Sequence, residues 1–233
     1  MRLGETEESF KYHPPMTILG ALLTDTAVYM ASDAAERTPD YWSGHGVADH
    51  LDKPKVQQVG SQALLWAYYG DGVRGDALAK WVQTNAIGFK NWTIAVDKIK
   101  AECADVNARP EWVGHPTVGA VFAGWLDGTQ DYCHIPIGSG CPNLYSVNLN
   151  KNPHFAGIGC CAGDVAFAAS EKALPDAESL FHFENAMEST IRNIADLWGG
   201  NSNFRDPLKL IRVTRNAKVT TIRGRPQPEV TTQ

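Results

Sequence analysis

The stretch Thr17-Ile-Leu-Gly-Ala-Leu-Leu-Thr24, followed after Asp25-Thr26 by Ala27-Val-Tyr-Met-Ala-Ser32, decides the fold that this sequence predicts. The two apolar runs have the length of strands, and the polar pair between them is typical of a tight turn, so we expect a hairpin. Neither run alternates with polar residues. Strands that are apolar on both faces are typical of sheets buried between layers. The stretch therefore predicts a strand pair packed inside a layered fold.

The rest of the chain adds further groups of strands and helices. We expect a loop over 34–54, a hairpin over 55–59 and 63–69, a glycine-rich turn over 70–75, helices at 76–86 and 92–107, strands at 117–126, 143–148 and 154–159, helices at 162–172 and 176–198, and strands at 208–214 and 217–222. In the second helix, the apolar stripe consists of Ile94, Val96, Ile99 and Cys103. This order favours two antiparallel sheets with a helix pair outside each over a βαβ repeat. The predicted fold class is therefore α+β, a four-layer αββα sandwich.

Length and composition argue against several classes of protein. The 233 residues suit one large domain, and 43% of them are apolar. A net charge of −5 argues against nucleic acid or an anionic membrane as the partner, and no apolar run reaches the length of a membrane span. Residues 1–15 are acidic and polar, the opposite of a signal peptide, so we expect a cytoplasmic protein.

The cysteines and histidines predict neither disulfides nor a cofactor. The five cysteines are odd in number and contain no C-x-x-C pair, which argues against a disulfide framework. The seven histidines show no ligand spacing with these thiols. We therefore expect no metal and no other cofactor.

The opening hairpin resembles that of a proteasome β subunit, of the N-terminal-nucleophile (Ntn) hydrolase superfamily. In that family a nucleophilic Thr begins the first strand and an Asp closes the second. Here Thr17 and Asp33 are sixteen residues apart, which matches the family spacing. The segment Lys55-Val-Gln-Gln-Val-Gly60 is similar to the family's third strand, which bears a Lys. The loop before it is about six residues longer than the resemblance implies, so Lys53 stays an alternative to Lys55.

Later segments extend the resemblance to about residue 222. The run Asn143-Leu-Tyr-Ser-Val-Asn148, followed by Phe155-Ala-Gly-Ile-Gly159, is similar to the family's Leu-Tyr-Ser-Val hairpin and Gly-Ser-Gly turn. The resemblance implies the Ntn-hydrolase fold. We divide the chain into an N-terminal extension or propeptide at 1–16, the proteasome-like domain at 17–223 and a tail at 224–233.

The resemblance also implies a mechanism. The hydroxyl of Thr17 would be the nucleophile, and the free α-amine of the same residue would be its base. Asp33 would orient both groups, while Lys55 would supply positive charge that lowers the proton affinity of the amine. A backbone N–H of Gly70 or Gly72 would stabilise the oxyanion, and the sequence leaves the choice between them open.

Two supporting positions depart from the family pattern. Cys160 stands where the family has the Ser of its Gly-Ser-Gly turn, and Asp196 aligns with a late supporting Asp. The Ser expected shortly after that Asp corresponds to Gly199, unless the gap shifts and Ser202 serves.

The amine of Thr17 is bonded to Met16 in the chain as written, so the nucleophile needs to be freed. An aminopeptidase would free it if synthesis starts at Met16, and self-cleavage before Thr17 is the other route. The function that the resemblance implies is a threonine peptidase or amidohydrolase that cleaves peptide or protein substrates and assembles into a homo-oligomeric ring. The sequence does not decide whether an ATP-dependent unfoldase works with it.

Two alternatives stay open. The first is a non-catalytic structural ring subunit of the same fold, in which Thr17 is permanently blocked. The second interprets Gly159-Cys-Cys-Ala-Gly163 as a nucleophile elbow with a reactive Cys161, because the motif lies between a predicted strand and a predicted helix.

Overall fold

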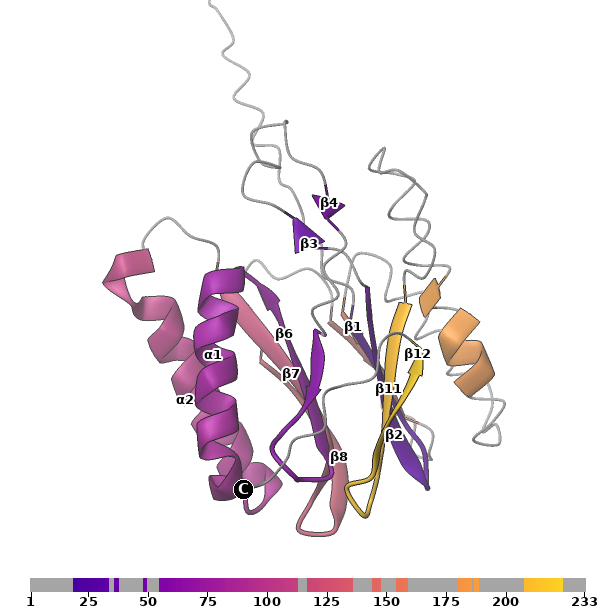
Figure 1. The fold of residues 1–233 in the computed structure, drawn as a ribbon. Coiled ribbons are helices and arrows are strands. Elements are labelled where there is room, and N and C mark those ends of the chain that lie inside the picture. The colour runs from indigo at the N-terminus through magenta and orange to yellow at the C-terminus, as the bar shows by residue number, and fades with distance from the viewer. Residues whose placement is uncertain are drawn as a thin grey trace, which may run out of the picture.

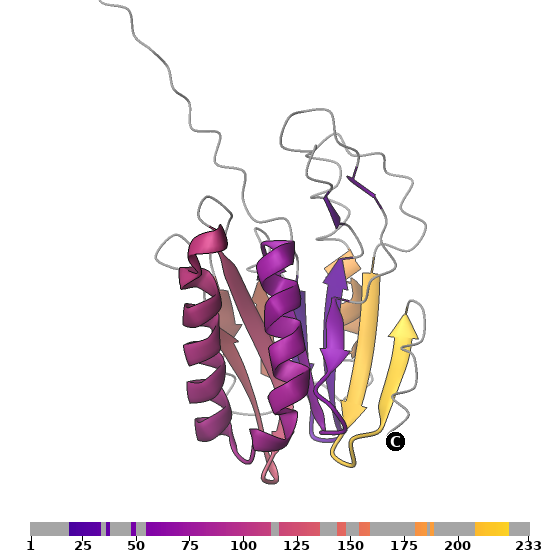
Figure 2. The same cartoon turned by 60° about the vertical axis from the view of Figure 1, so that its left-hand side comes forward.

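The computed structural model describes residues 19–33, 36–37, 48–49, 55–112, 117–135, 144–147, 154–158, 180–185, 187–188 and 208–223. Within them, two antiparallel sheets lie face to face with helices outside each (Figure 1). A second view, turned by 60°, shows the helical layer beside the sheets (Figure 2). The predicted αββα sandwich is confirmed.

The six-stranded sheet contains the opening hairpin near its middle. Its order is β12-β11-β2-β1-β10-β9, and all neighbours are antiparallel. The strands are β1 (Leu19–Leu23), β2 (Ala27–Asp33), β9 (Leu144–Val147), β10 (His154–Ile158), β11 (Leu208–Thr214) and β12 (Val219–Arg223). Leu19 stands opposite Ser32, and Leu23 opposite Val28. Every residue of β1 and β2 is buried, as their lack of polar alternation predicts.

The four-stranded sheet has the order β5-β6-β7-β8. Its strands are β5 (Val56–Gln58), β6 (Leu64–Gly70), β7 (Val118–Leu126) and β8 (Thr129–Ile135). Strand β8 was not predicted from the sequence, because its first half is polar and largely exposed. The signal for it was the turn Asp127-Gly128, where both residues have positive φ, at 52° and 73°. An Asp-Gly turn with two left-handed residues is typical of a two-residue hairpin.

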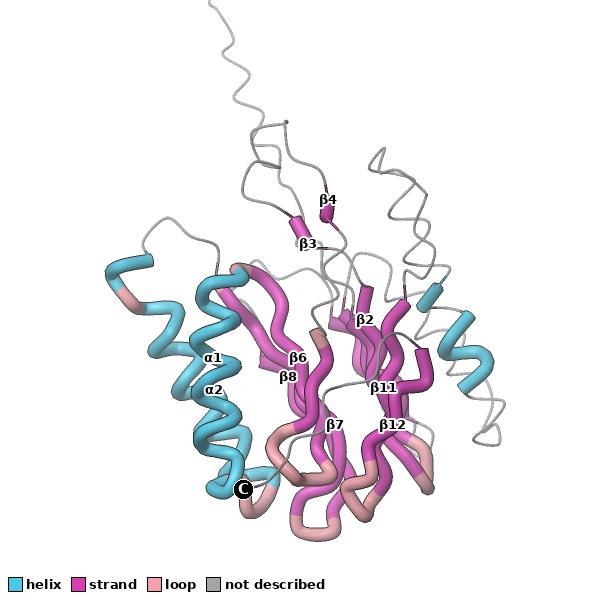
Figure 3. Tube along the Cα trace, viewed as in Figure 1, coloured by secondary structure: helices cyan, strands magenta, loops and turns pink. Residues whose placement is uncertain are grey.

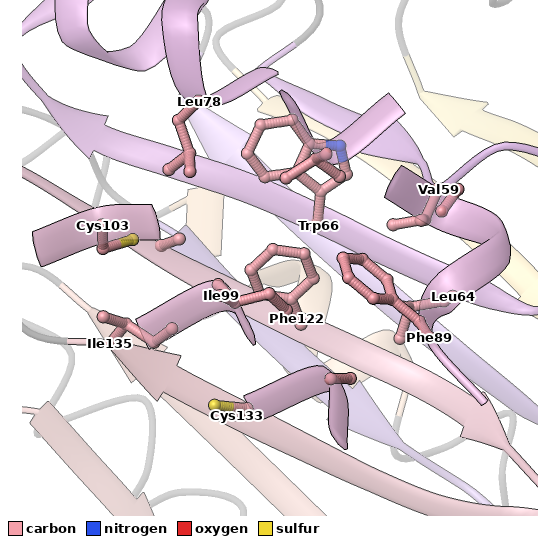
Figure 4. Packing of buried hydrophobic residues seen from close by; sticks show 14 of the residues in the cluster. Val59, Leu64, Trp66, Leu78, Phe89, Ile99, Cys103, Phe122, Cys133 and Ile135 are labelled. Carbon is pink, nitrogen blue, oxygen red and sulfur yellow. The ribbon is translucent and has the colours of Figure 1, made fainter. Parts of the chain in front are cut away.

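Helices α1 (Gly72–Asn85) and α2 (Trp92–Ala108) cover the outer face of the four-stranded sheet. The core beneath them stacks Trp66 on Phe122, with ring centroids 5.5 Å apart, and places the edge of Phe89 against Phe122 (Figure 4). Short 3₁₀ turns at Ala86–Gly88 and Pro110–Trp112 follow the two helices.

Two helix predictions need correction. The first helix begins at Gly72 rather than at residue 76, because the side chain of Asp71 caps it by accepting a hydrogen bond from the Arg74 N–H. In α2 the buried residues are Ala95, Ile99, Cys103 and Val106, whereas the predicted Ile94 is 38% exposed. Asn91 caps this helix through the Ile94 N–H, which places Ile94 in the exposed first turn.

A second apolar core fills the space between the two sheets. Side-chain amides close this space at one end, since Gln130 Nε2 donates to the Thr24 carbonyl at 2.7 Å and Gln58 Nε2 donates to the Ala217 carbonyl at 3.2 Å. The hairpin turns gather at this end, shown in pink at the bottom of Figure 3. These hydrogen bonds therefore connect the two sheets at the end where the hairpin turns lie.

The outer face of the six-stranded sheet carries a helix over 180–185 and 187–188. Phe183 and Met187 are buried, and a Cβ on Gly20 of β1 would lie 2.7 Å from the Met187 sulfur. Arg223 Nη1 also donates to Glu188 Oε2 at 2.7 Å. The rest of the predicted helix 176–198 and all of 162–172 lie outside the described residues.

Two smaller findings complete the fold. Within the predicted loop 34–54, β3 (Glu36–Arg37) pairs antiparallel with β4 (Ala48–Asp49), so that prediction was wrong at these four residues. Two-residue strands are too short to show a periodic pattern. Among the described helices, none is long and apolar enough to cross a membrane.

Candidate active site

The two charged residues that the sequence analysis singled out are in contact. Lys55 Nζ donates to Asp33 Oδ2 at 2.6 Å. The carboxylate is nearly buried, with 4% of its side chain exposed, and the lysine side chain is 19% exposed. A charge-assisted hydrogen bond of this length, largely shielded from water, fixes both side chains in one arrangement. Lys53, the alternative to Lys55, lies outside the described residues.

This ion pair joins the two sheets at the end opposite the hairpin turns. Asp33 is the last residue of β2 in the six-stranded sheet, and Lys55 immediately precedes β5 in the four-stranded sheet. In Figure 1, β3 and β4 lie beyond this same end. The strands β1 and β5 begin here, and β2 and β6 finish here, so residues from four strand ends come together.

The glycine-rich turn lies at this end too. Gly70 ends β6 with a φ of 102°, a left-handed conformation that glycine adopts without the steric cost of a Cβ. Gly72 is the first residue of α1 and is exposed. Among the described residues, no group accepts a hydrogen bond from the Gly72 N–H. The turn thus presents the Gly72 N–H and the positive dipole end of a helix, a combination that suits an anion.

Three of the residues that the sequence analysis selected lie outside the described residues, namely Thr17, Cys160 and Asp196. The same holds for Cys161, Gly199 and Ser202 of the alternatives. Chain connectivity alone limits the place of Thr17, because it precedes Leu19 by two residues. Two peptide units span at most about 7 Å. Leu19 in turn stands opposite Ser32, the neighbour of Asp33.

Sequence reasoning missed Ser32 itself. Its side chain is fully buried, and its Oγ has no hydrogen-bond partner among the described residues. Residues directly opposite each other in an antiparallel pair share a face. Ser32 therefore shares the face of Leu19, which belongs to the core between the sheets. The pairing register thus places this hydroxyl on the core face of β2, one residue before Asp33.

Tyr69, which is buried between the two sheets, contacts the half-buried His134 of the neighbouring region of β8. The hydroxyl of Tyr69 and Nε2 of His134 are 2.5 Å apart, and the two rings stack. Burial lowers the pKa of His134 to about 4, so its imidazole is neutral at pH 7. The contact therefore joins a neutral imidazole to the tyrosine hydroxyl.

The described cysteines are poor nucleophiles. Burial raises the pKa of the Cys103 thiol to about 12 and that of Cys133 to about 11. Both side chains belong to the core beneath α1 and α2, where they pack as small apolar groups. In the part of the chain that the structure describes, no group of three His, Cys, Asp or Glu residues is placed to hold a metal ion.

Comparison with known proteins bears on the fold. No protein-family model and no curated protein matches this sequence. Among solved structures, the chain is similar to Anbu (ancestral beta-subunit) from Yersinia bercovieri. The TM-score is 0.62 at 13% sequence identity, over 88% of this chain and 86% of that chain. This likeness shows the fold alone. It agrees with the architecture that the proteasome β-subunit resemblance implies, and it leaves the catalytic residues as predictions.

Proposed function

We infer that this chain is a threonine-type Ntn hydrolase, which cleaves peptide or other amide bonds once the amine of Thr17 is free. The observation that carries this proposal is the shielded Lys55–Asp33 ion pair at the end of the sandwich where β1 begins. Two oppositely charged groups meet there, and Thr17 lies two residues before Leu19, whose strand partner Ser32 precedes Asp33. A purely structural chain needs no such pair there, since apolar residues of similar volume would pack at least as favourably.

The mechanism would divide one difficult step into two. The Thr17 Oγ attacks the substrate carbonyl carbon, and its proton passes to the α-amine of Thr17. The tetrahedral oxyanion then collapses, the C–N bond breaks, and the amine base returns the proton to the leaving nitrogen. Water next attacks the Thr17 ester in the same way, releasing the acid product and restoring the hydroxyl.

The ion pair supports two parts of this scheme. The Asp33 carboxylate would accept hydrogen bonds from the hydroxyl and the amine, orienting both. The Lys55 ammonium would hold that carboxylate in place and favour the neutral, proton-accepting form of the amine.

Of the two candidate oxyanion donors, we favour Gly72. Its N–H lies at the first position of α1, where the dipole of a helix of 14 residues adds to the hydrogen bond. Gly70 is the last residue of β6, opposite Val118, and precedes the N-cap of α1, so its N–H lies outside the helix. A single preorganised donor of this kind is worth about 3 kcal/mol in transition-state stabilisation.

We further infer a homo-oligomeric ring as the working assembly, from the family resemblance. Light scattering at micromolar concentration should report a multiple of the chain mass of 25.4 kDa. A single species at the chain mass would refute the ring.

The function is tested with two chains, one starting at Met1 and one starting at Met16, from which methionine aminopeptidase exposes Thr17. Intact mass establishes each terminus, and both are assayed on small peptide amides. The chain beginning at Thr17 should hydrolyse them, and its Thr17→Ala variant should not. A chain that keeps residues 1–16 should be inactive, because an acylated amine accepts no proton. If a free Thr17 gives no hydrolysis, the structural-subunit alternative replaces this proposal. If the unprocessed chain is active and survives Thr17→Ala, Cys161 becomes the candidate nucleophile.

A further inference from the structure

A buried arginine lies directly behind the glycine-rich turn. Arg74, in the first turn of α1, is 3% exposed. Its Nη1 donates to the carbonyls of Val106 and Asn107 at 2.8 Å each. These carbonyls belong to the last turn of α2, where main-chain oxygens have no partner within the helix. The guanidinium thus satisfies them and meets the negative end of the α2 dipole.

The side chain of Asn107 continues the connection to the sheet. Its Nδ2 donates to the Val118 carbonyl at 2.9 Å, and its Oδ1 accepts from the Val118 N–H at 2.8 Å. Val118 is the first residue of β7 and stands opposite Gly70. The Asn107 side chain therefore hydrogen-bonds both the N–H and the carbonyl of Val118, the residue opposite Gly70.

Main-chain contacts complete the anchoring of the turn itself. The Asp71 N–H donates to the Thr117 carbonyl at 3.3 Å, next to the Asn107 contact on β7. The Arg74 N–H donates to Asp71 Oδ1 at 2.9 Å, and the Gly75 N–H donates to the Asp71 carbonyl at 2.9 Å. The Arg74 side chain thereby connects the first turn of α1 directly to α2. The Asn107 side chain connects the turn to α2 indirectly, through Val118 of β7.

We propose that Arg74 and Asn107 are positioning residues, which fix the Gly72 N–H relative to the nucleophile of the hydrolase inferred above. The inference rests on that proposed function. Neither side chain is placed to touch a substrate, since one is buried between the helices and the other is bonded to Val118. An oxyanion donor works only within about 2.7–3.1 Å of the developing charge. A displacement of about 1 Å at a catalytic group costs on the order of 100-fold in rate.

The test combines hydrogen–deuterium exchange with kinetics. The variants are Arg74→Met and Asn107→Ala, with Arg74→Lys and Asn107→Asp as milder changes in case the first two fail to fold. The matched control is Asn85→Ala, which removes a similar half-buried amide from the far end of α1, where Asn85 Nδ2 donates to the Trp81 carbonyl at 2.9 Å.

Exchange is measured in the full-length chain at the amides of Asp71, Arg74 and Gly75, which donate the bonds described above. It should become at least tenfold faster in the Arg74 and Asn107 variants and stay unchanged in β1 and β2. In the chain beginning at Thr17, kcat should fall at least tenfold while KM stays within twofold. The control should show neither effect at a comparable loss of melting temperature.

Unchanged exchange at the three amides, or an equal rise across the whole chain, would overturn the positioning role. So would a loss of kcat that the Asn85 control reproduces. If the wild-type chain beginning at Thr17 hydrolyses nothing, the proposed function fails and the link to catalysis falls with it. The exchange measurement still decides separately whether the two residues fix the turn.

Discussion

Replacing Gly72 with proline would remove a single N–H group while leaving the helix that carries it intact. Proline is favoured at the first position of a helix, where its missing N–H has no intrahelical acceptor. The residue before a proline must be extended, and Asp71 already is, with φ of −71° and ψ of 132°. Gly72 is exposed, so the ring meets no buried neighbour. The geometry therefore admits the substitution.

Two effects of opposite sign follow. Exchanging glycine for a residue with fewer unfolded conformations should stabilise the fold by about 0.4–1 kcal/mol. Losing the only main-chain donor at this position should raise the barrier by about 3 kcal/mol, or roughly 100- to 1000-fold in kcat. The expected variant is thus slightly more stable and far less active.

The comparison is made with Gly72→Ala, which keeps the N–H and differs only in the ring. Both variants are prepared as chains beginning at Thr17, melted thermally and assayed by steady-state kinetics on the same peptide amide. The ratio of their kcat values should reach at least 100. A ratio below about 3, with both chains folded, would refute Gly72 as the oxyanion donor and return Gly70 to that role.

Three other predictions test different parts of the structure. Asp33→Asn should lower kcat/KM on the order of 100-fold in steady-state kinetics, because a neutral amide no longer pairs with Lys55; a loss under threefold in a folded chain would contradict its role. Because burial lowers the pKa of His134 to about 4 from 6.5, the unfolded chain takes up this proton first, and stability should fall as pH drops from about 6.5 towards 4. Urea titrations at several pH values should show that this group changes the free energy of unfolding by less than about 1.4 kcal/mol per pH unit, because its partial exposure reduces the effect. The same pH dependence in His134→Gln would argue against this role of His134. Cys103 and Cys133, whose pKa values burial raises, should escape iodoacetamide at pH 8 in the folded chain and react in urea, and peptide mapping that finds either alkylated without urea would contradict their burial.

The parts of the fold that sequence reasoning predicted are those with a strong local pattern. The β1–β2 hairpin could be predicted because its two strands are unbroken apolar runs, which are typical of strands buried between layers. Strand β8 was missed because its first half is polar and exposed, so no apolar alternation marks it. The start of α1 was placed four residues late, because the capping role of Asp71 depends on a single side-chain contact within a glycine-rich stretch.

The residues of the candidate site could be predicted only in part, because their contacts depend on the tertiary structure. Asp33 and Lys55 were selected through a family resemblance, and their contact depends on how two sheets stack, which no local pattern reports. Arg74 drew no attention, since an arginine in the first turn of a helix is ordinarily a solvated surface residue. Its burial follows only from the position of the end of α2. Tertiary contacts, rather than local propensity, determine the burial and the hydrogen bonds of these residues.

The central claim is that Thr17 attacks with its own free amine as base. A peptide epoxyketone tests it directly, because a stable ring adduct needs both the hydroxyl, which adds to the ketone, and the amine, which opens the epoxide. The chain beginning at Thr17 is treated with this reagent, and the modified residue is located by intact mass and peptide mapping. We expect one reagent per chain, attached at Thr17, and none on a chain that keeps residues 1–16. An unmodified Thr17 with a free amine, or an adduct on Cys161 instead, would contradict it.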